Sequence, residues 1–208
     1  MNRIYRIDQL SQTQITEMAA QIEAGAVVAF PTDTVYGIGT NAFNEGSISR
    51  IYHIKNRPTK AALQILVSSK EQAQEITRWS EEADKLSAAF WPGGLTLILP
   101  ANEKGQPLLR GFAGLGLRVP AYEPLIKILQ QMKVPLASTS ANIHGDPVIT
   151  QEEKILEFCQ GKADIVLLGG NLSSCSSSVV ELTSSVKILR EGTVSKAALE
   201  NILGFGVQ

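Results

Sequence analysis

Two short segments of the chain hold the residues with the clearest chemical potential. Lys55 and Arg57 lie two positions apart, and Pro58 follows them. The run 138–142 gathers three hydroxyl groups and a carboxamide directly after an apolar stretch. Arginine offers phosphate oxygens a planar fork of donors, whereas lysine offers a mobile point charge. Together the segments predict a pocket for a polyphosphate and a small polar substrate.

The Lys55–Arg57 pair allows two interpretations. Pro58 disfavours helical backbone at Arg57, so the preceding helix should end near Asn56. In an extended segment, residues i and i+2 share a face, and both cations could then point at one anion. The alternative is a solvated basic helix end favoured by the helix dipole, which is the commoner outcome for this spacing alone.

Two hydroxyl-rich segments each follow an apolar strand. The segment 31–39 offers Thr32, Thr34 and Tyr36 beyond the strand 26–30, where ligands bind in open α/β sheets. A simple turn stabilised by Asp33 explains it equally well. The run 138–142 could likewise be a turn in which side chains satisfy the backbone, but its density of donors favours a ligand site.

Arg118 stands inside an otherwise apolar strand. An isolated buried charge is expensive, so this guanidinium requires an anionic partner. A structural carboxylate and a substrate carboxylate remain equally good candidates. Two further segments are weak signals alone: Arg190 at a strand end, and the serine-rich stretch 171–178, which usually indicates a flexible surface loop.

Several common chemistries find no support in the sequence. The glycines spell neither a dinucleotide-binding fingerprint nor a P-loop, and no serine sits in a nucleophile elbow. Two cysteines and two histidines without metal-ligand spacing argue against structural zinc. A net charge of −1, from 19 basic and 20 acidic residues, argues against a strongly basic nucleic-acid binder.

Helical and strand patterns alternate along the chain, which indicates an α/β class with a mixed, twisted sheet. We expect helices at 12–23, 47–54, 70–90 with a break near Ser80, 124–132, 152–159 and 195–203. We expect strands at 26–30, 63–67, 95–99, 115–119, 134–137, 164–168, 178–182 and 186–189, the last two as an antiparallel hairpin. At 208 residues, one domain spanning 1–208 is the default. The absence of a secretory apolar region and of a 20-residue apolar run predicts a cytoplasmic protein that contacts no membrane.

Taken together, these segments resemble the YrdC/TsaC family, the threonylcarbamoyl-AMP synthases. Six motifs occur in the family's order across nearly the whole chain: PTDTVYGIG at 31–39, KNRP at 55–58, GLRVP at 116–120, STSAN at 138–142, SSSVVE at 176–181 and LREG at 189–192. The resemblance implies a twisted α/β fold with a large concave, positively lined cavity. It also implies synthesis of threonylcarbamoyl-AMP and pyrophosphate from L-threonine, bicarbonate and ATP, for the threonylcarbamoyl modification of adenosine 37 in tRNA.

The family pattern also assigns roles to residues of this chain. It implies threonine contacts by Thr34, Tyr36, Arg118, Ser140 and Ser177. It implies ATP contacts by Arg57, Gly114, Asn142, Thr150 and Arg190. Lys55 and Arg57 would stabilise charge on the phosphates together with Mg²⁺, and no protein residue would act as a covalent nucleophile. No protein-held metal site is expected.

The chain departs from the family pattern at three positions. Ala61 and Ala62 stand where a lysine or asparagine and then a proline are usual, and Leu66 stands where some members carry histidine. These changes put one nucleotide contact in question and keep open a superfamily member acting on another carbamoyl adenylate. The intact 140–142 element favours the synthase branch. The chain's end at Gln208 resembles the family's short form, without the long form's extra C-terminal domain.

The resemblance also implies partners. The product would pass to a downstream threonylcarbamoyl-transferase complex. A second functional class, a module that binds double-stranded RNA or tRNA through the family's basic cavity, predicts strongly salt-dependent binding. The near-neutral charge counts against it as the main role.

Overall fold

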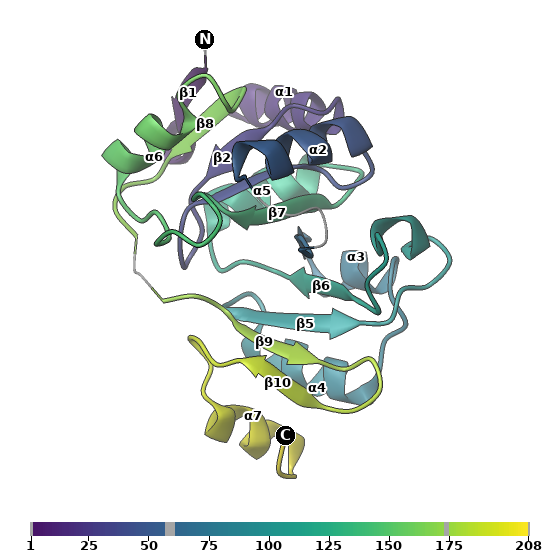
Figure 1. The fold of residues 1–208 in the computed structure, drawn as a ribbon. Coiled ribbons are helices and arrows are strands. Elements are labelled where there is room, and N and C mark those ends of the chain that lie inside the picture. Colours follow the sequence, from purple (N-terminus) through teal and green to yellow (C-terminus); the bar gives the residue numbers. More distant parts are fainter. Residues whose placement is uncertain (1, 57–60, 173–174, 208) are drawn as a thin grey trace.

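A computed structural model describes residues 2–56, 61–172 and 175–207. Within these residues, ten strands form one mixed sheet in the order β1-β8-β2-β3-β7-β4-β6-β5-β9-β10 (Figure 1). The strands are β1 Arg3–Arg6, β2 Val28–Phe30, β3 Gly37–Asn41, β4 Gln64–Leu66, β5 Leu95–Leu99, β6 Leu115–Arg118, β7 Leu136–Ser140, β8 Ile165–Leu168, β9 Ser178–Glu181 and β10 Lys187–Arg190. The pairs β1–β8, β2–β8, β4–β6 and β5–β9 are parallel, and the other neighbouring pairs are antiparallel. The expected α/β class with a mixed sheet is confirmed.

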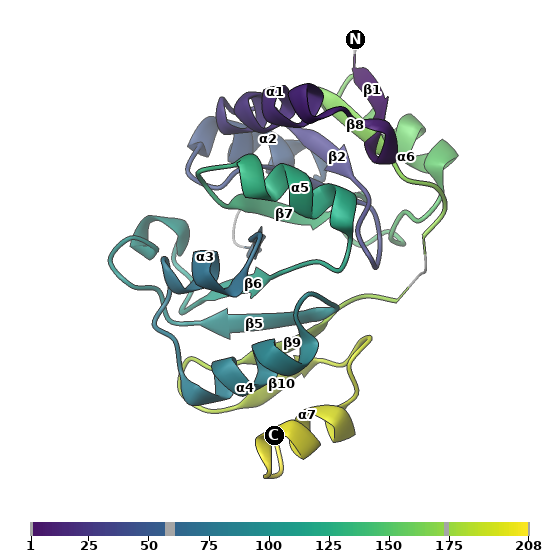
Figure 2. The same ribbon diagram turned by 180° about the vertical axis from the view of Figure 1, so that it is seen from behind.

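Helices cover both faces of the sheet's first half. The helices α1 (Gln12–Glu23) and α5 (Glu123–Gln131) pack together on one face, and α2 (Glu45–Ile54) and α6 (Glu152–Cys159) cover the other (Figures 1 and 2). Ile15, Met18 and Ile22 recur at helical spacing and are buried between α1 and the sheet. This half therefore has three layers, with the sheet between two layers of helices.

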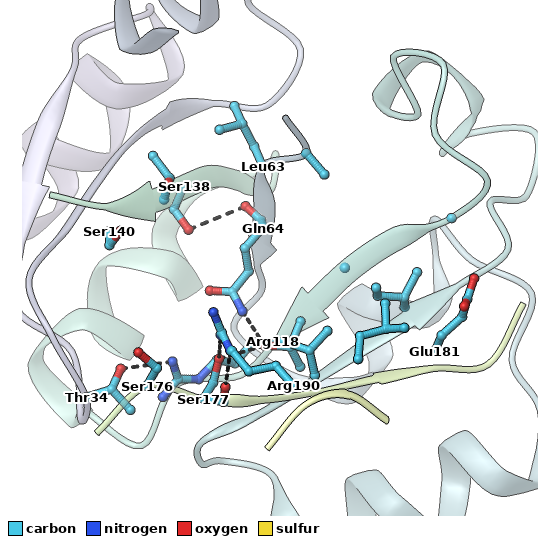
Figure 3. A pocket seen from close by; sticks show the side chains of 18 of the residues that line it. Thr34, Leu63, Gln64, Arg118, Ser138, Ser140, Ser176, Ser177, Glu181 and Arg190 are labelled. Carbon is cyan, nitrogen blue, oxygen red and sulfur yellow. Dashed lines mark hydrogen bonds between the residues drawn. The ribbon is translucent and has the colours of Figure 1, made fainter. Parts of the chain in front are cut away.

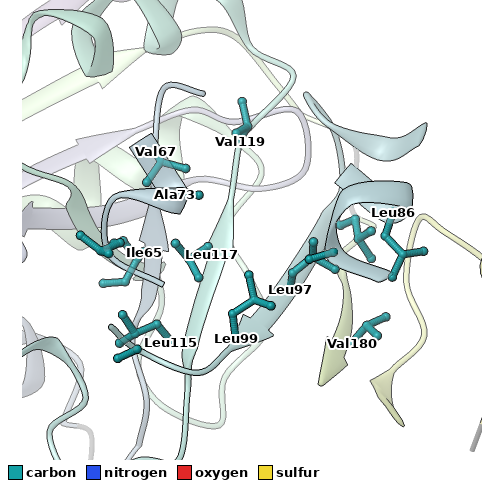
Figure 4. Packing of buried hydrophobic residues seen from close by; sticks show 14 of the residues in the cluster. Ile65, Val67, Ala73, Leu86, Leu97, Leu99, Leu115, Leu117, Val119 and Val180 are labelled. Atoms are coloured by element: carbon teal, nitrogen blue, oxygen red, sulfur yellow. The ribbon is translucent and has the colours of Figure 1, made fainter. Parts of the chain in front are cut away.

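The second half of the sheet has helices behind it in Figure 1, where α3 (Lys70–Gln74), α4 (Glu81–Phe90) and α7 (Lys196–Leu203) lie. Alternate strand residues supply its core, including Ile65, Leu97, Leu117 and Val180, all at most 1% exposed (Figure 4). Because successive strand residues face opposite sides, their neighbours must face the other side of the sheet. Those neighbours build the cavity described below.

The helix boundaries follow from local chemistry. Ser11, Ser80 and Ser195 each accept a hydrogen bond from a backbone N–H of the first turn, so the predicted starts of α1, α4 and α7 are confirmed. The α2 helix begins at Glu45 rather than at Ser47, because Asn44 supplies its N-cap. Two short 3₁₀ turns, Ile7–Gln9 and Gln106–Leu108, complete the helical segments.

The observed strands agree less well with the strands predicted from the sequence. β5 and the β9–β10 hairpin are confirmed. The strand predicted at 134–137 runs instead from Leu136 to Ser140, so the hydroxyl-rich segment is largely strand. β1 and β3 were not predicted, and β3 falls within the segment interpreted as a turn.

Candidate active site

A cavity of about 570 Å³ lies on the face of the sheet opposite α4 (Figure 3). Strand residues that alternate with the core residues form its floor: Gln64 of β4, Gly116 and Arg118 of β6, Thr96 and Ile98 of β5, and Val179 and Glu181 of β9. Six of the predicted site residues line it: Thr34, Gly114, Arg118, Ser140, Ser177 and Arg190. Residues spread over more than 150 positions of the chain therefore share one cavity.

Arg118 is held from three sides at the end of β6 and is only 3% exposed. Its Nη2 donates to Asp33 Oδ1 at 2.7 Å, its Nε to the Gly93 carbonyl at 2.8 Å and its Nη1 to Thr34 Oγ1 at 3.1 Å. The structural carboxylate expected as one alternative is thus Asp33. Within the described residues these bonds use three of the five guanidinium N–H groups, which leaves two for a ligand.

The turn before β3 presents Thr34 to the cavity. Thr32 organises this turn, because its hydroxyl accepts from the backbone N–H groups of Thr34 and Val35 at 3.1 and 3.2 Å. The two threonine hydroxyls lie 2.9 Å apart, and both residues are buried. The segment is therefore an internally bonded turn that also forms part of the cavity wall, and contact of Thr34 with a ligand stays a prediction.

Ser177 stands between two strands and ties them together. The guanidinium of Arg190 donates from Nε to the Ser177 carbonyl at 2.9 Å and from Nη2 to the Ser177 hydroxyl at 3.0 Å. The same hydroxyl lies 3.1 Å from Thr96 Oγ1. The end of the serine-rich stretch is thus a bonded wall, and Ser177 is only 4% exposed.

The cavity concentrates positive charge at its polar end. Burial lowers the pKa of Arg118, and the charge of Asp33 opposes that shift. Partial burial of its guanidinium, followed by repulsion from Arg118, lowers the pKa of Arg190. Two cations that repel each other beside a row of hydroxyls make a site that binds an anion favourably.

The opposite end of the cavity is more apolar. Glu181 of β9 lies at this end, away from Thr34 and Ser140 (Figure 3), and Ile98 of β5 is its strand partner. Phe112, Val179 and Leu189 also line the cavity. Gly114 permits close approach here, because a Cβ atom would lie 2.8 Å from Ile98 Cγ2 and 2.9 Å from the Leu99 carbonyl. A ligand with a flat apolar part and a polyanionic part fits this division.

Lys55 does not line the cavity and instead supports its wall. Its side chain is 1% exposed, and its ammonium donates to the carbonyls of Ser140 and Asn142 and to Asn142 Oδ1. The alternative of a solvated helix end is therefore wrong for Lys55. Arg57, its predicted partner on the same anion, lies outside the described residues.

Three other predicted residues do not line the cavity. The Tyr36 hydroxyl donates to the Gly170 carbonyl at 2.8 Å and accepts from the Gly169 N–H at 3.1 Å, so it fastens the chain after β8. Asn142 is turned inward onto Lys55. Thr150 accepts the backbone N–H of Leu172 at 2.9 Å. Direct contact of these side chains with a ligand stays a prediction, and this arrangement gives it no support.

Comparison with known proteins places this geometry in a family. The Sua5/YciO/YrdC family pattern, described as "Telomere recombination", matches residues 20–192. The chain belongs to this family. It is 35% identical over 201 residues to a threonylcarbamoyl-AMP synthase of Pyrococcus abyssi and 32% identical over 204 residues to one of Bacillus subtilis. Each match covers 95% of this chain and 59% of the relative, so the chain spans well under two thirds of these relatives.

A solved structure of the Sua5/YciO/YrdC family supports the fold in detail. The structure of P. abyssi Sua5 complexed with L-threonine superposes with a TM-score of 0.88 at 34% identity, over 100% of this chain and 62% of that one. The likeness extends over every strand of the cavity floor. The three residues that depart from the family pattern lie in different surroundings. Ala62 lines the cavity, and Leu66 is buried in the core. The Ala61 carbonyl accepts a hydrogen bond from the Tyr52 hydroxyl at 2.9 Å.

The cavity of this Sua5/YciO/YrdC-family chain also contains residues that the sequence interpretation missed. Gln64, Thr96 and Glu181 are polar residues on the cavity side of three strands. Strict alternation with the buried Ile65, Leu97 and Val180 is the sequence signal that would have found them. Among the described residues, no cluster of three metal-ligating side chains occurs, and no helix is long and apolar enough to cross a membrane.

Proposed function

We propose that the chain is an L-threonylcarbamoyladenylate synthase that forms threonylcarbamoyl-AMP and pyrophosphate from L-threonine, bicarbonate and ATP. We further propose that residues 1–208 act as one YrdC-like domain, because strands from both ends of the chain join one sheet. The observation that carries the function is the pair of arginines, Arg118 and Arg190, at one end of a cavity whose other end is apolar. The synthase names of the relatives support the same conclusion.

Arg118 is the proposed carboxylate anchor for L-threonine. It is already oriented by Asp33, Gly93 and Thr34, so binding costs little side-chain entropy. Its two remaining N–H groups match the two oxygens of a carboxylate. Thr34, Ser140 and Ser177 surround this point with hydroxyl groups. Holding the substrate at this end directs its other groups toward the rest of the cavity.

In the proposed reaction the protein aligns the substrates and stabilises charge, and no protein side chain forms a covalent bond. The threonine amine attacks the carbon of bicarbonate or CO₂ and gives a carbamate, with loss of water in the case of bicarbonate and of a proton in the case of CO₂. A carbamate oxygen then bonds to the α-phosphorus of ATP, and the bond from that phosphorus to the bridging oxygen of pyrophosphate breaks. Arg190, and Arg57 from outside the described residues, would stabilise charge on the phosphates.

Mg²⁺ would enter as part of the substrate MgATP. Magnesium is commonly held by one or two carboxylates plus substrate phosphates and keeps several waters. Glu181 is the carboxylate that lines the cavity within the described residues, and its Oε1 accepts from Thr183 at 2.7 Å. Glu181 lies at the apolar end, so within the described residues the nucleotide phosphates rather than the protein would carry the ion, and the ion would neutralise phosphate charge.

The test is pyrophosphate release by purified protein with ATP, Mg²⁺, bicarbonate and L-threonine. We expect release that requires both L-threonine and bicarbonate, with serine and no amino acid as controls. ATP binding without turnover would contradict the proposal and favour a member acting on another carbamoyl adenylate. Salt-sensitive binding of tRNA or double-stranded RNA without nucleotide binding would favour the RNA-binding role instead.

The same proposal defines a partner class. The product is a mixed anhydride of a carbamate and a phosphate, which water destroys readily. A downstream threonylcarbamoyl-transferase complex that acts on tRNA is therefore the proposed consumer. Mass spectrometry of tRNA after addition of such a complex would detect threonylcarbamoyladenosine only when this protein is active.

A further inference from the structure

Gln64 occupies an unusual place on the cavity floor. It lies on β4, directly opposite Gly116 of the neighbouring strand β6. Because Gly116 has no side chain, the Gln64 carboxamide passes across β6, and its Nε2 donates to Thr96 Oγ1 on β5. Figure 3 shows this side chain reaching from β4 down toward Arg118, Arg190 and Ser177.

The Gln64–Thr96 contact continues a hydrogen-bonded row. Thr96 Oγ1 lies 3.1 Å from the Ser177 hydroxyl, which accepts from Arg190. Thr96 and Ser177 are each 4% exposed, so the row is fixed by its surroundings. The Gln64 amide is consequently anchored at its nitrogen, and its orientation is set before any ligand binds.

The carboxamide oxygen of Gln64 is an acceptor in a cavity rich in donors. The positive charges of Arg118 and Arg190 favour the oxygen, not the nitrogen, on the cavity side. No donor to this oxygen occurs among the residues that the structure describes. By contrast, Ser140 already donates its hydroxyl hydrogen to Asn142 Oδ1 at 2.6 Å. A ligand hydroxyl at this end therefore finds its acceptor at Gln64.

We propose that Gln64 is a specificity-determining residue of the amino-acid subsite, and that its Oε1 accepts a hydrogen bond from the β-hydroxyl of the substrate. This inference rests on the proposed synthase function. The reacting amine must face the second substrate, which the proposed function puts toward the apolar end of the cavity. The group directed at the floor, where Gln64 and Thr96 lie, is then the unreactive side chain.

The recognition has a measurable consequence. A site built to hydrogen-bond a substrate hydroxyl rejects an analogue that lacks it, because its own polar group is left unpaired. L-2-aminobutyrate has the carbon skeleton of L-threonine without the hydroxyl. The ratio of kcat/KM for L-threonine to that for L-2-aminobutyrate therefore reports on Gln64, and a general structural defect leaves this ratio unchanged.

The experiment compares wild type with Gln64→Met, which keeps the length and removes the polar group. We expect Gln64→Met to lower the ratio about tenfold, with kcat/KM for L-2-aminobutyrate retained within about twofold. Thr96→Val, which removes the anchor and keeps the amide, should lower the ratio by a smaller factor. Gln74→Met, the same change at an exposed position of α3, should leave the ratio unchanged.

Calorimetric titration of L-threonine without ATP distinguishes a failure of the Gln64 assignment from a failure of the proposed synthase function. Suppose that wild type binds L-threonine, and that Gln64→Met either keeps the wild-type ratio or lowers kcat/KM for L-threonine and L-2-aminobutyrate equally. The assignment of Gln64 is then wrong, while the proposed function stands. If wild type neither binds L-threonine nor releases pyrophosphate with it, the proposed function falls and the Gln64 assignment falls with it.

Discussion

The ammonium of Lys55 holds Asn142 through both its backbone carbonyl, at 2.7 Å, and its side-chain oxygen, at 2.9 Å. Lys55 is the C-cap of α2, and Asn142 lies just beyond β7, so one buried cation joins the two segments that the sequence singled out separately. The Ser140 hydroxyl donates to the same Asn142 oxygen at 2.6 Å. The wall of the cavity at Ser140 is therefore shaped by a lysine that does not reach the cavity itself.

Replacement of Lys55 by methionine tests this arrangement. Met preserves the buried stem but removes the ammonium donor from the backbone carbonyls of Ser140 and Asn142, which costs about 1–3 kcal/mol of unfolding free energy. Pyrophosphate release should fall at least about tenfold, because Ser140 loses its fixed position. Urea unfolding measures the first effect. A Lys55→Met protein of wild-type stability would contradict the supporting role.

Arg118→Lys tests the carboxylate anchor. Lysine keeps a positive charge beside Asp33 but cannot bind Gly93, Thr34 and a substrate carboxylate as well. We expect the KM for L-threonine to rise more than about tenfold, with the KM for ATP little changed. Arg50→Lys, the same change at a surface pair with Asp164, is the matched control. An equal rise in both KM values would show that Arg118 only maintains the fold.

Arg190→Gln tests the second cation. Arg190 is accessible from the cavity and is repelled by Arg118, so losing its charge should change the free energy of unfolding by no more than about 1 kcal/mol. The KM for ATP should rise about tenfold, because a phosphate contact is lost. Arg78→Gln, at an exposed position, is the control. A selective rise in the KM for L-threonine would instead assign Arg190 to the amino-acid subsite.

Local signals predicted the helices well. The start of α1 follows from Ser11 and the spacing of Ile15, Met18 and Ile22, all of which act within one helix. β3 is not predicted from the sequence, because its signal is not local. Gly37 and Gly39 weaken the strand pattern, yet the strand needs glycine at both positions to pack against the ring of Phe30. A Cβ atom at Gly37 would lie 2.8 Å from that ring. Strand pairing, not propensity, determines this element.

The site residues likewise divide into those that local sequence predicts and those that only the fold reveals. Arg118 could be predicted, because a charge in an apolar strand demands a partner, although only the fold identifies Asp33 as that partner. The burial of Lys55 could not, because the distance from α2 to the end of β7 depends on the packing of both against β3. Alternation with the buried Ile65 indicates which face of β4 carries Gln64, but only the register of β4 against Gly116 shows that its side chain reaches Thr96.

Asp164 offers a test of the fold that depends on pH. Its carboxylate accepts from the Val27 N–H at 2.7 Å and from both terminal nitrogens of Arg50 at 2.9 and 3.0 Å. Burial raises the pKa of Asp164, but the bonds to Arg50 and Val27 outweigh it, and the pKa is lowered. A lowered folded-state pKa stabilises the protein above the ordinary aspartate value of about 3.9, and the effect is lost as pH falls through the folded-state pKa.

Asp164→Asn should therefore lower the free energy of unfolding by about 1 kcal/mol at pH 7, the modest size reflecting a side chain that is 37% exposed. The difference from wild type should stay constant between about pH 5 and 8 and shrink below about pH 4, as measured by urea unfolding at each pH. Glu81→Gln, which breaks an exposed pair with Lys85, should change stability by less than about 0.5 kcal/mol throughout. A deficit in Asp164→Asn that persists unchanged at low pH would mean that packing, and not the charge on Asp164, joins α2 to the start of β8.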